Sequence, residues 1–365
     1  MDTKLPRKYR PSQLSQVVGQ KHIVATLTQA SINNKFSQAY LFSGIKGCGK
    51  TSMGRILSKL MTCENQVKGE SCGHCRACKT IPSNASLDVK ELDGASRNKV
   101  EEARGIIDAA HYPPSELKRK IFIIDECHML TKQANNAMLK LVEEPPSYLN
   151  FIFCTTEPRK MLDTILSRCQ RFNFYHIPSK SIAKRLKMIA QQENINIDDK
   201  ALFIIAKMAR GSLRDAIGYL EQIGTVGMNK SIREDHIQKY FGIADRKGIH
   251  DMVLAIKNGN IPLLLDLINE LVIAGAMCKD ILFEITEVLR SVMILKTKKE
   301  NGNELIDLPD FEIEELKKIS EGIKLSQLLK MAHLFADIDK QLEFSINDRW
   351  IMEATLINCI AILRK

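Results

Sequence analysis

A short segment near the start of the chain has the residue types and spacing needed to hold a triphosphate. Gly44-Ile-Lys-Gly-Cys-Gly-Lys50-Thr51 matches the pattern G-x-x-x-x-G-K-[ST]. Its glycines let backbone N–H groups wrap phosphate oxygens, and a following helix directs the positive end of its dipole at them. The lysine of such a loop reaches the β and γ phosphates, and the threonine holds Mg²⁺. The residues expected to bind the nucleotide here are Gly44, Gly47, Cys48, Gly49, Lys50, Thr51 and Ser52.

A second segment supplies two carboxylates. In Ile121-Phe-Ile-Ile-Asp125-Glu126, an apolar run delivers both acids to its carboxyl end, where ligands bind in open α/β sheets. We expect Asp125 to contribute to the Mg²⁺ shell and Glu126 to orient and polarise the attacking water. By itself this pattern is common and describes many solvated strand ends. Together with the phosphate loop, it indicates a nucleotide-hydrolysing site.

Four cysteines follow the phosphate loop with the spacing of a metal site: Cys63, Cys72, Cys75 and Cys78. In a reducing cytoplasm disulfides are disfavoured, and two C-x₂-C steps place thiolates at chelating distance. A closed shell of four thiolates is typical of structural Zn²⁺. An iron–sulfur cluster is the rival interpretation, although the fourth cysteine of a ferredoxin-like run is missing. Two further alternatives are a zinc site in which His74 replaces one thiol, and a loop that binds no metal.

These side chains require a scaffold, and the surrounding sequence predicts a parallel α/β sheet. Between residues 36 and 178, apolar runs at 39–42, 87–92, 121–124 and 151–154 alternate with helix-like segments such as 56–61 and 137–142. Runs of four apolar residues bounded by polar ones fit strands that are buried on both faces. We therefore expect an α/β domain at residues 1–178, with the cysteine module at 63–78 inserted in it.

Two helical regions follow this domain. Residues 179–242 are expected to form a small helical domain, in which Asp198 precedes a helix, Gly211-Ser212 separates two helices, and Ser231 to Glu234 has capping-box spacing. Residues 243–365 are also helical by period, at 261–276, 281–295, 311–319, 325–336 and 350–363. We expect this last region to serve packing or oligomerisation.

Composition narrows the class of protein. Of 365 residues, 44% are hydrophobic and 26% are charged, as in soluble globular proteins. No segment fits a membrane span or a secretory signal, so we expect a cytoplasmic protein. The formal net charge is +10, and the first 60 residues hold ten Lys or Arg against one acid. Such a block suits polyanions, either a nucleotide's phosphates or a nucleic-acid backbone, although a solvated basic face is also possible.

With these motifs placed, the chain resembles the AAA+ ATPases and, among them, the gamma/tau family of bacterial DNA polymerase III clamp-loader subunits. The resemblance covers nearly all of residues 1–242, whereas the last region matches only in length and helical character. The segments that carry it are Lys8-Tyr-Arg-Pro-Ser12, Val17-Val-Gly-Gln20, Gly44–Thr51, Asp125-Glu-Cys-His-Met-Leu130, Ala137-Met-Leu-Lys-Leu-Val-Glu-Glu-Pro-Pro146, Thr155-Thr-Glu-Pro158 and Ile165-Leu-Ser-Arg-Cys169.

The resemblance implies roles for further residues. Arg10 and Val18 would line the adenine end of the pocket, and Thr156, rather than Thr155, would sense the γ-phosphate or the water. Arg168 would be an arginine finger donated to a neighbouring subunit, although an arginine beside a strand is, taken alone, more often part of a surface salt bridge.

Arg214 can also be interpreted from its position. Gly211 suits the position after a helix, and Ser212 suits the N-cap of the next helix. Arg214 then lies in a first helical turn, where a cation is unfavourable with the helix dipole, which indicates a polyanion nearby. The resemblance makes Arg214 the sensor that couples a helical lid to ATP.

The resemblance further implies DNA and protein partners. Arg97, Lys99 and Lys140 would contact the duplex backbone, and solvated surface residues are the alternative for each. The implied function is an ATP-hydrolysing clamp-loader subunit in the bacterial replisome. It would use ATP, Mg²⁺ and Zn²⁺, and act with other loader subunits, the sliding clamp and primed template DNA. A non-catalytic scaffold subunit and another AAA+ DNA-remodelling ATPase are the alternatives.

Overall fold

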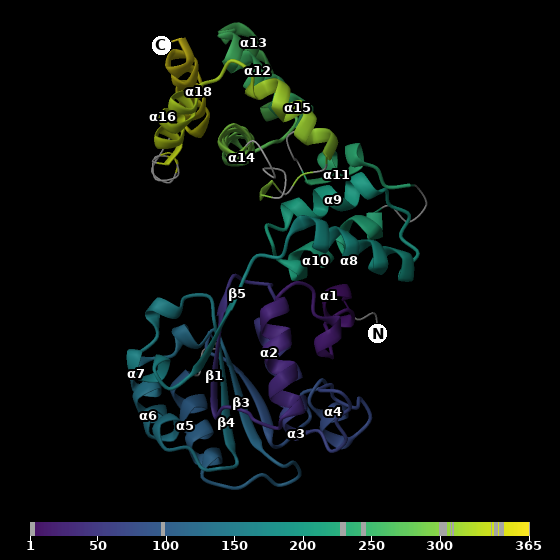
Figure 1. The fold of residues 1–365 in the computed structure, drawn as a ribbon, viewed down its shortest axis with the longest axis vertical. Coiled ribbons are helices and arrows are strands. Elements are labelled where there is room, and N and C mark those ends of the chain that lie inside the picture. The colour runs from purple at the N-terminus through teal and green to yellow at the C-terminus, as the bar shows by residue number, and fades with distance from the viewer. Residues whose placement is uncertain are drawn as a thin grey trace. The chain divides into compact units, whose positions relative to one another are not determined.

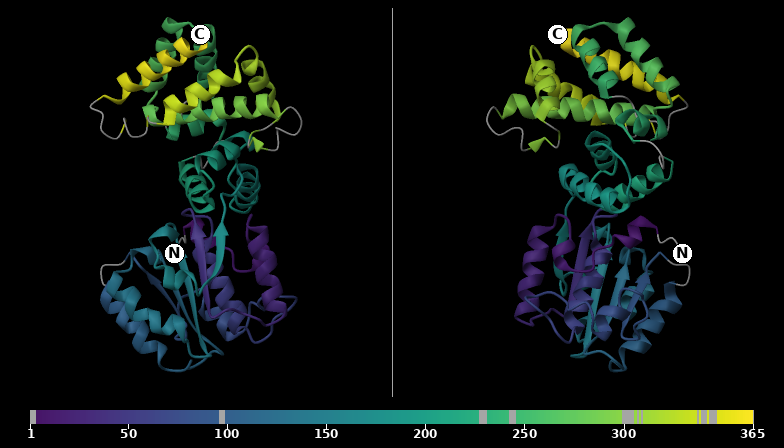
Figure 2. Two further views of the ribbon diagram at one scale, coloured as in Figure 1. Left: turned by 60° about the vertical axis from the view of Figure 1, so that its left-hand side comes forward. Right: turned by 90° about the vertical axis from the view of Figure 1, so that its right-hand side faces the viewer.

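The computed structural model describes residues 4–364 except 96–98, 227–230, 242–245, 299–304, 307, 309, 337, 339–341 and 343–346. The chain divides into two compact units, Met1–Met228 and Asn229–Lys365, drawn in Figures 1 and 2. The first unit contains all the residues expected to act on the nucleotide. No helix among the described residues is long and apolar enough to cross a membrane.

The first unit is built on a parallel sheet of five strands in the order β2-β3-β4-β1-β5. The parallel arrangement places the carboxyl ends of all the strands at one edge, so the segments that follow them lie close together. Gly44, Asp125 and Thr155, each the last residue of its strand, meet at this edge. The strands are β1 (Ala39–Gly44), β2 (Val89–Asp93), β3 (Lys120–Asp125), β4 (Leu149–Thr155) and β5 (Gln170–Phe174).

Both faces of the sheet are covered by helices, as the views in Figures 1 and 2 agree. On β1, Tyr40 and Phe42 pack with α2 (Lys21–Ile32), α3 (Lys50–Thr62) and α4 (Arg76–Thr80). Ala39 and Leu41 point the other way, toward α5 (Lys99–Ala110), α6 (Lys132–Glu143) and α7 (Asp163–Leu166). This alternation follows from the two-residue period of a strand, and it explains the continuous apolar runs.

The expected fold class is confirmed, and all four expected strands lie in the sheet. The fifth strand, β5, was not expected from the sequence. Its residues Gln170-Arg-Phe-Asn-Phe174 alternate between exposed and buried, and only Phe172 and Phe174 enter the core. The strand is polar on one face because it pairs with β1 alone, at the edge of the sheet.

Helices α8 (Ser179–Gln192), α9 (Asp199–Met208) and α10 (Leu213–Val226) form a small lid within the first unit. Asp198 caps α9 by accepting from the Ala201 N–H, and Ser212 Oγ accepts from the Asp215 N–H, 3.2 Å away. The expectation that Gly211 directly follows the C-cap is wrong: the C-cap is Ala209, so Arg210, at φ 47°, holds that position, and Gly211, at φ 85°, comes one residue later. Shorter elements are α1 (Leu5–Lys8) and the 3₁₀ turns η1 (Leu14–Gln16), η2 (Cys127–Met129) and η3 (Pro158–Lys160).

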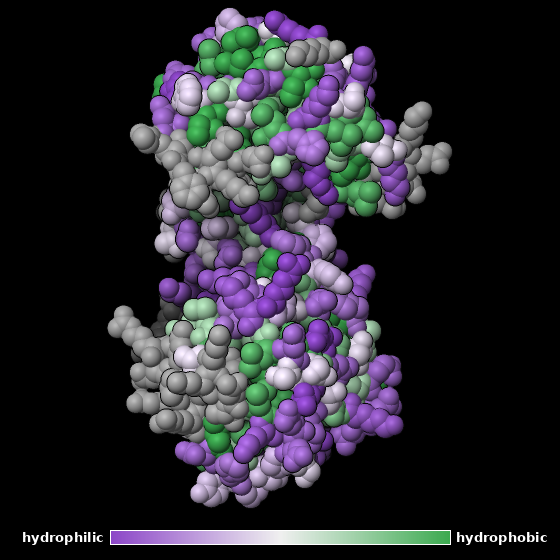
Figure 3. Space-filling model, turned by 90° about the vertical axis from the view of Figure 1, so that its left-hand side faces the viewer, coloured by the Kyte–Doolittle hydropathy of each residue, from purple (hydrophilic) through white to green (hydrophobic). Residues whose placement is uncertain are grey.

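Helices of the second unit enclose a core of their own. Residues 242 and 243, where the sequence places a domain boundary, lie outside the described residues. The capping box expected at Ser231 is wrong, because the helix begins at Glu234. The face drawn in Figure 3 intersperses hydrophilic and hydrophobic side chains over both units. The helices are α11 (Glu234–Phe241), α12 (Arg246–Asn258), α13 (Ile261–Ile273), α14 (Cys278–Thr297), α15 (Asp310–Ser320), α16 (Leu325–Ala336) and α18 (Asp348–Arg364).

Candidate nucleotide site and metal centre

The phosphate loop joins β1 to α3 at the carboxyl edge of the sheet. Gly47 and Gly49 have φ 78° and 104°, a left-handed region in which a side chain is strained. Lys50 is buried, and its Nζ donates to the carbonyl oxygens of Gly44 and Ile45, both at 2.8 Å. Cys48 is also buried, with its thiol 2.9 Å from the Ile45 oxygen. These two hydrogen bonds therefore hold the ammonium group of Lys50 inside the loop, although Lys50 is itself the first residue of α3.

Thr51 and Asp125, the two expected Mg²⁺ ligands, converge from different elements. Thr51 Oγ1, in the first turn of α3, donates to Asp125 Oδ2 at 2.7 Å. The other carboxylate oxygen accepts from the Glu126 N–H at 3.1 Å. Burial raises the pKa of Asp125, as does the nearby charge of Glu126. A hydroxyl and a carboxylate in contact match the oxygen ligands that Mg²⁺ prefers, and the cation would offset the cost of burying the charge.

Glu126 lies beside the end of β4. Its Oε2 accepts from Thr156 Oγ1 at 3.1 Å and from the Thr156 N–H at 3.3 Å. Thr155 is fully buried, and its Oγ1 lies 2.9 Å from His128 Nδ1. The two threonines therefore differ: Thr156 contacts the carboxylate expected to activate water, whereas the hydroxyl of Thr155 bonds to the imidazole.

Two residues at this edge were not identified from the sequence. The side chain of His128 is 6% exposed, with Nδ1 3.5 Å from Glu126 Oε2 and Nε2 3.5 Å from Glu157 Oε1. Gly94 follows β2, and a Cβ there would lie 2.6 Å from the Glu126 carbonyl oxygen. His128 could have been suspected, because it follows the two acids in the same segment. Gly94 could not, because its neighbour is distant in sequence.

The lid contacts the phosphate loop directly. The Arg214 N–H, in the first turn of α10, lies 3.5 Å from the Gly47 carbonyl oxygen. A Cβ on Gly47 would lie only 1.9 Å from Ser212 Oγ, so glycine is what permits this approach. Arg214, which we expect to contact the nucleotide, therefore belongs to a helix whose N-terminus contacts the phosphate loop.

Arg10 and Val18 lie on the N-terminal segment, and both are half-buried. Burial lowers the pKa of Arg10, and so do the positive charges of Arg55 and Arg214. Arg55 is itself paired with Glu91, at 2.5 Å. A bound polyanion would offset the repulsion that Arg55 and Arg214 exert on Arg10, which is consistent with a nucleotide bound beside these arginines.

Arg168 lies away from the phosphate loop and from the other residues expected to contact the nucleotide. It precedes β5, whose first residue pairs with Tyr40 near the start of β1, whereas the phosphate loop follows Gly44 at the other end of that strand. Arg168 donates to the Thr164 carbonyl at 2.9 Å and pairs with Glu143 at 3.0 Å. Since the strands are parallel, the length of the sheet separates Arg168 from the chain's own phosphate loop.

The four cysteines form one cluster, in which all the sulfur atoms lie within 4.8 Å of one another. Cys63 Sγ is 3.9 Å from both Cys75 Sγ and Cys78 Sγ. Tetrahedral Zn²⁺ with Zn–S bonds of about 2.3 Å requires sulfur atoms roughly 3.8 Å apart, so the spacing fits. Burial raises the pKa of Cys78 to about 12, and a bound cation would hold it as the thiolate. His74 Nδ1 instead bonds to the Cys72 carbonyl oxygen, at 3.0 Å.

The residues expected to contact DNA remain predictions. Arg97 and the side chain of Lys99 lie outside the described residues. Lys140 is exposed on α6.

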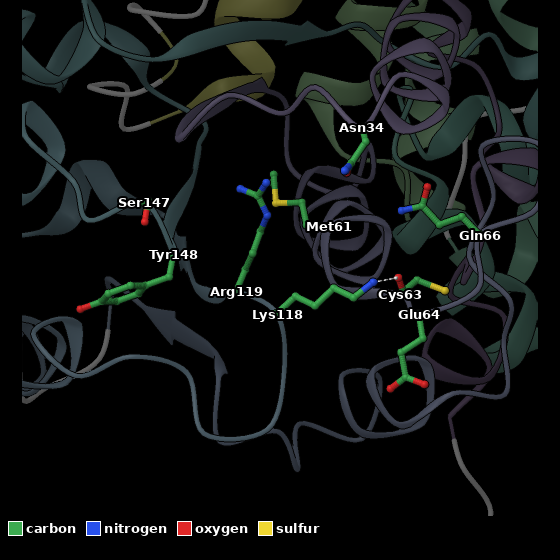
Figure 4. Close-up of a pocket in the computed structure, with 9 residues that line it drawn as sticks. All are labelled: Asn34, Met61, Cys63, Glu64, Gln66, Lys118, Arg119, Ser147 and Tyr148. Carbon is green, nitrogen blue, oxygen red and sulfur yellow. Dashed lines mark hydrogen bonds between the residues drawn. The ribbon is translucent and has the colours of Figure 1, made fainter.

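A separate cavity of about 510 Å³ lies at the amino edge of the sheet (Figure 4). Lys118 Nζ crosses it to the Cys63 carbonyl oxygen, 3.4 Å away. Of the expected site residues only Cys63 lines it, so the cavity is not the nucleotide site. Its lining residues are Asn34, Met61, Cys63, Glu64, Gln66, Lys118, Arg119, Ser147 and Tyr148.

Comparison with known families gives consecutive matches along the chain. Residues 19–178 match the model described as DNA polymerase III, delta subunit. Residues 181–227 match the DNA polymerase III clamp loader subunit, ATPase lid domain. Residues 232–364 match DNA polymerase III subunits gamma and tau domain III.

Curated proteins give a consistent result. The chain is 36% identical to DNA polymerase III subunit tau of Bacillus subtilis, over 97% of its length and 62% of the relative's. It is 33% identical to DNA polymerase III subunit tau of Escherichia coli, over 98% of its own length and 55% of the relative's. It is 32% identical to DNA polymerase III subunit gamma of Buchnera aphidicola, over 99% of both chains. The chain thus spans little more than half the length of the two tau relatives.

Among solved structures, the RuvB Holliday junction branch migration motor of Thermotoga maritima matches with a TM-score of 0.48 and 20% identity. The match covers 68% of this chain and 79% of that one.

Proposed function

The chain belongs to the gamma/tau family of DNA polymerase III clamp-loader subunits, within the AAA+ proteins, and we propose that it is an ATP-hydrolysing motor subunit of such a loader. In this role it opens the ring-shaped sliding clamp and loads it on primed DNA, in the bacterial cytoplasm. The observation that carries the proposal is the contact between Thr51 and Asp125, beside the contact between Glu126 and Thr156.

We infer the role of each residue from its position in the site. Lys50 and the N–H groups of the loop hold the β and γ phosphates, and Thr51 and Asp125 supply oxygen ligands for Mg²⁺. The cation, when bound, offsets phosphate charge. Glu126 orients the attacking water and draws its proton, and Thr156, whose hydroxyl donates to that carboxylate, senses the γ-phosphate or the water.

The neighbouring subunit is proposed to complete the site. Arg168 lies at the opposite edge of the sheet from its own phosphate loop, so its guanidinium serves the ATP of an adjacent subunit. There it stabilises the charge of the transition state. Arg10, Val18 and Arg214 act on the nucleotide within the subunit, and Arg214 reports its presence to the lid.

Zn²⁺ is proposed as a structural ion in the cluster of Cys63, Cys72, Cys75 and Cys78. Lys140, Arg97 and Lys99 are proposed to contact the DNA backbone, and residues 243–365 to assemble with other loader subunits. The boundaries 1–178, 179–242 and 243–365 remain our proposed division of the chain.

ATP binding and hydrolysis, measured with reconstituted loader, clamp and primed template, test this proposal. We expect tight Mg-ATP binding by the chain and hydrolysis that depends on assembly and DNA. A chain that binds no nucleotide would instead be a non-catalytic scaffold subunit. Nucleotide-driven strand separation without clamp loading would indicate another kind of AAA+ motor.

A further inference from the structure

We propose that the cysteine cluster serves the nucleotide site, because the carboxylate of Glu70 ties the cluster's loop to the chain segment that carries Arg10 and Val18. The inference rests on the proposed function of these two residues at the nucleotide. It gives the metal centre a role beyond holding its own loop together, and it makes Glu70 a positioning residue for ATP.

The loop between Cys63 and Cys72 presents Glu70 in a fixed direction. Val67 and Glu70 exchange two backbone hydrogen bonds, of 3.0 and 2.9 Å, that close a tight turn. Gly69 in this turn has φ 81° and lies against α2, where a Cβ would meet Thr28 Cγ2 at 2.9 Å. The turn therefore packs on α2, with its carboxylate directed at the N-terminal segment.

Glu70 accepts two backbone N–H groups of that segment. Leu14 N–H donates to Oε2 at 3.0 Å, and Ser15 N–H donates to Oε1 at 2.7 Å. These groups open η1, where no earlier turn supplies acceptors, so the carboxylate is their partner. Leu14 is 1% exposed and lies in the same apolar cluster as the cysteines.

Two neighbouring contacts reinforce the attachment. Gln13 Nε2 donates to the carbonyl oxygen of Ser71 at 3.4 Å. Lys59, buried beside the thiols, donates through Nζ to the Ser12 carbonyl oxygen. Every residue from 12 to 15 thus has a backbone or side-chain bond to the cluster loop or to the helix that leads into it.

The other end of the segment is held by the lid. The Leu5 N–H donates to Glu221 Oε1 at 2.8 Å, and Lys8 pairs with Glu193 at 2.8 Å. Tyr9 also donates to Glu193. Arg10 therefore lies between an anchor on the lid and an anchor on the cysteine loop, and releasing either one frees the guanidinium.

A metal ion would affect this arrangement because its ligands include the residues at both ends of the loop. Cys63 and Cys72 bound the loop on either side of Glu70, and both belong to the four-thiol group. An ion held by these thiolates closes the loop, and its removal opens it. Loss of the ion should therefore loosen the segment around Leu14 and weaken nucleotide binding, although the phosphate loop itself is untouched.

The test compares Glu70→Ala with Glu64→Ala in the full chain. Glu64 lies in the same loop and is exposed, but it does not contact residues 12–15, so its removal is the matched control. We expect Glu70→Ala to raise the Kd for a fluorescent ATP analogue by about tenfold while zinc content stays at the wild-type level. Glu64→Ala should change neither quantity.

Removing zinc from the wild-type chain with a chelator should weaken nucleotide binding to a similar extent, with little further loss in Glu70→Ala. Hydrogen exchange gives a readout independent of nucleotide. Amides of residues 12–16 should lose protection in Glu70→Ala and in the chelated wild type, while β3 stays protected.

An unchanged Kd in Glu70→Ala would overturn the inference. So would a chelated wild type in which residues 12–16 stay protected, an outcome that holds even if Glu70→Ala fails to fold. A wild-type chain that binds no ATP would overturn the proposed function instead, and the exchange of residues 12–16 would still decide whether Glu70 and the metal hold the segment.

Discussion

Glu126 has φ 43°, a left-handed conformation that few residues other than glycine adopt, and it follows a strand in which every residue but Asp125 is buried. The turn places its carboxylate beside Thr156 while the preceding residue, Asp125, faces Thr51. Two adjacent acids are thereby assigned to different partners. Backbone strain of this kind is held only where the surroundings fix it, here through His128, Thr156 and Gly94.

Glu126→Gln should separate binding from hydrolysis. The amide keeps the size of the side chain and can still accept from Thr156, but it cannot draw a proton from water. We expect Mg-ATP affinity near that of the wild type and turnover lower by about 100-fold or more, the usual contribution of a general base. Equilibrium binding and steady-state hydrolysis measure the two quantities. Turnover close to the wild-type rate would remove Glu126 from the mechanism.

Gly94→Ala tests whether the β2 end supports the two acids. A Cβ there would lie 2.6 Å from the Glu126 carbonyl oxygen and 3.0 Å from that of Asp125, so the turn must shift. We expect the turnover number to fall about tenfold while the chain stays folded. Gly105→Ala is the control, because a Cβ at that position meets nothing within 4 Å. Equal activity of the two variants would show that the turn tolerates displacement.

Among the elements, buried strands and helix caps can be predicted from the sequence, because both depend on residues that are close together in the chain. Four strands could be recognised because both faces of the sheet are covered, so their apolar runs are continuous. β5 could not, since its edge position leaves Gln170, Arg171 and Asn173 exposed. Asp198 and Ser212 were identified as caps because capping depends on neighbouring residues.

Contacts between distant residues could not be predicted in the same way. Ser212 lies against Gly47, and Glu70 binds Leu14, only because the folded chain brings them together. The phosphate loop and the cysteines were located because their chemistry fixes residue types at short spacing. His128 and Gly94 follow no such spacing rule.

Gly47→Ala should disturb the docking of the lid on the phosphate loop. The φ of 78° costs a non-glycine residue about 1 kcal/mol, and the added methyl would collide with Ser212 Oγ. We therefore expect weaker ATP binding. Adding Ser212→Gly removes the atoms that collide and should restore part of the affinity, although the backbone strain remains. A double variant no better than Gly47→Ala would contradict the packing of the lid on this loop.

Considered as a whole, the first unit holds the phosphate loop and Arg168, which we propose as the two parts of the hydrolytic site, at opposite ends of the strands of its sheet. The phosphate loop follows the carboxyl end of β1, and Arg168 precedes the amino end of β5. Glu143 pairs with the guanidinium at 3.0 Å, and in the proposed mechanism a neighbour's phosphates compete with this carboxylate for Arg168. If Arg168 acts on a neighbour's ATP as proposed, one chain alone offers a pocket without its arginine, and activity should require at least two chains in contact.

Complementation between two inactive variants tests whether Arg168 acts on the ATP of a neighbouring chain. Lys50→Ala chains keep Arg168 but lose the ammonium of the loop, and Arg168→Ala chains keep the pocket. Steady-state ATP hydrolysis with clamp and primed DNA would be measured for loaders assembled from each variant and from their mixture. Each variant alone should fall on the order of 10³-fold. We expect the mixture to recover activity, because an intact pocket on one chain can then meet an intact arginine on another. A mixture no more active than either variant would contradict it.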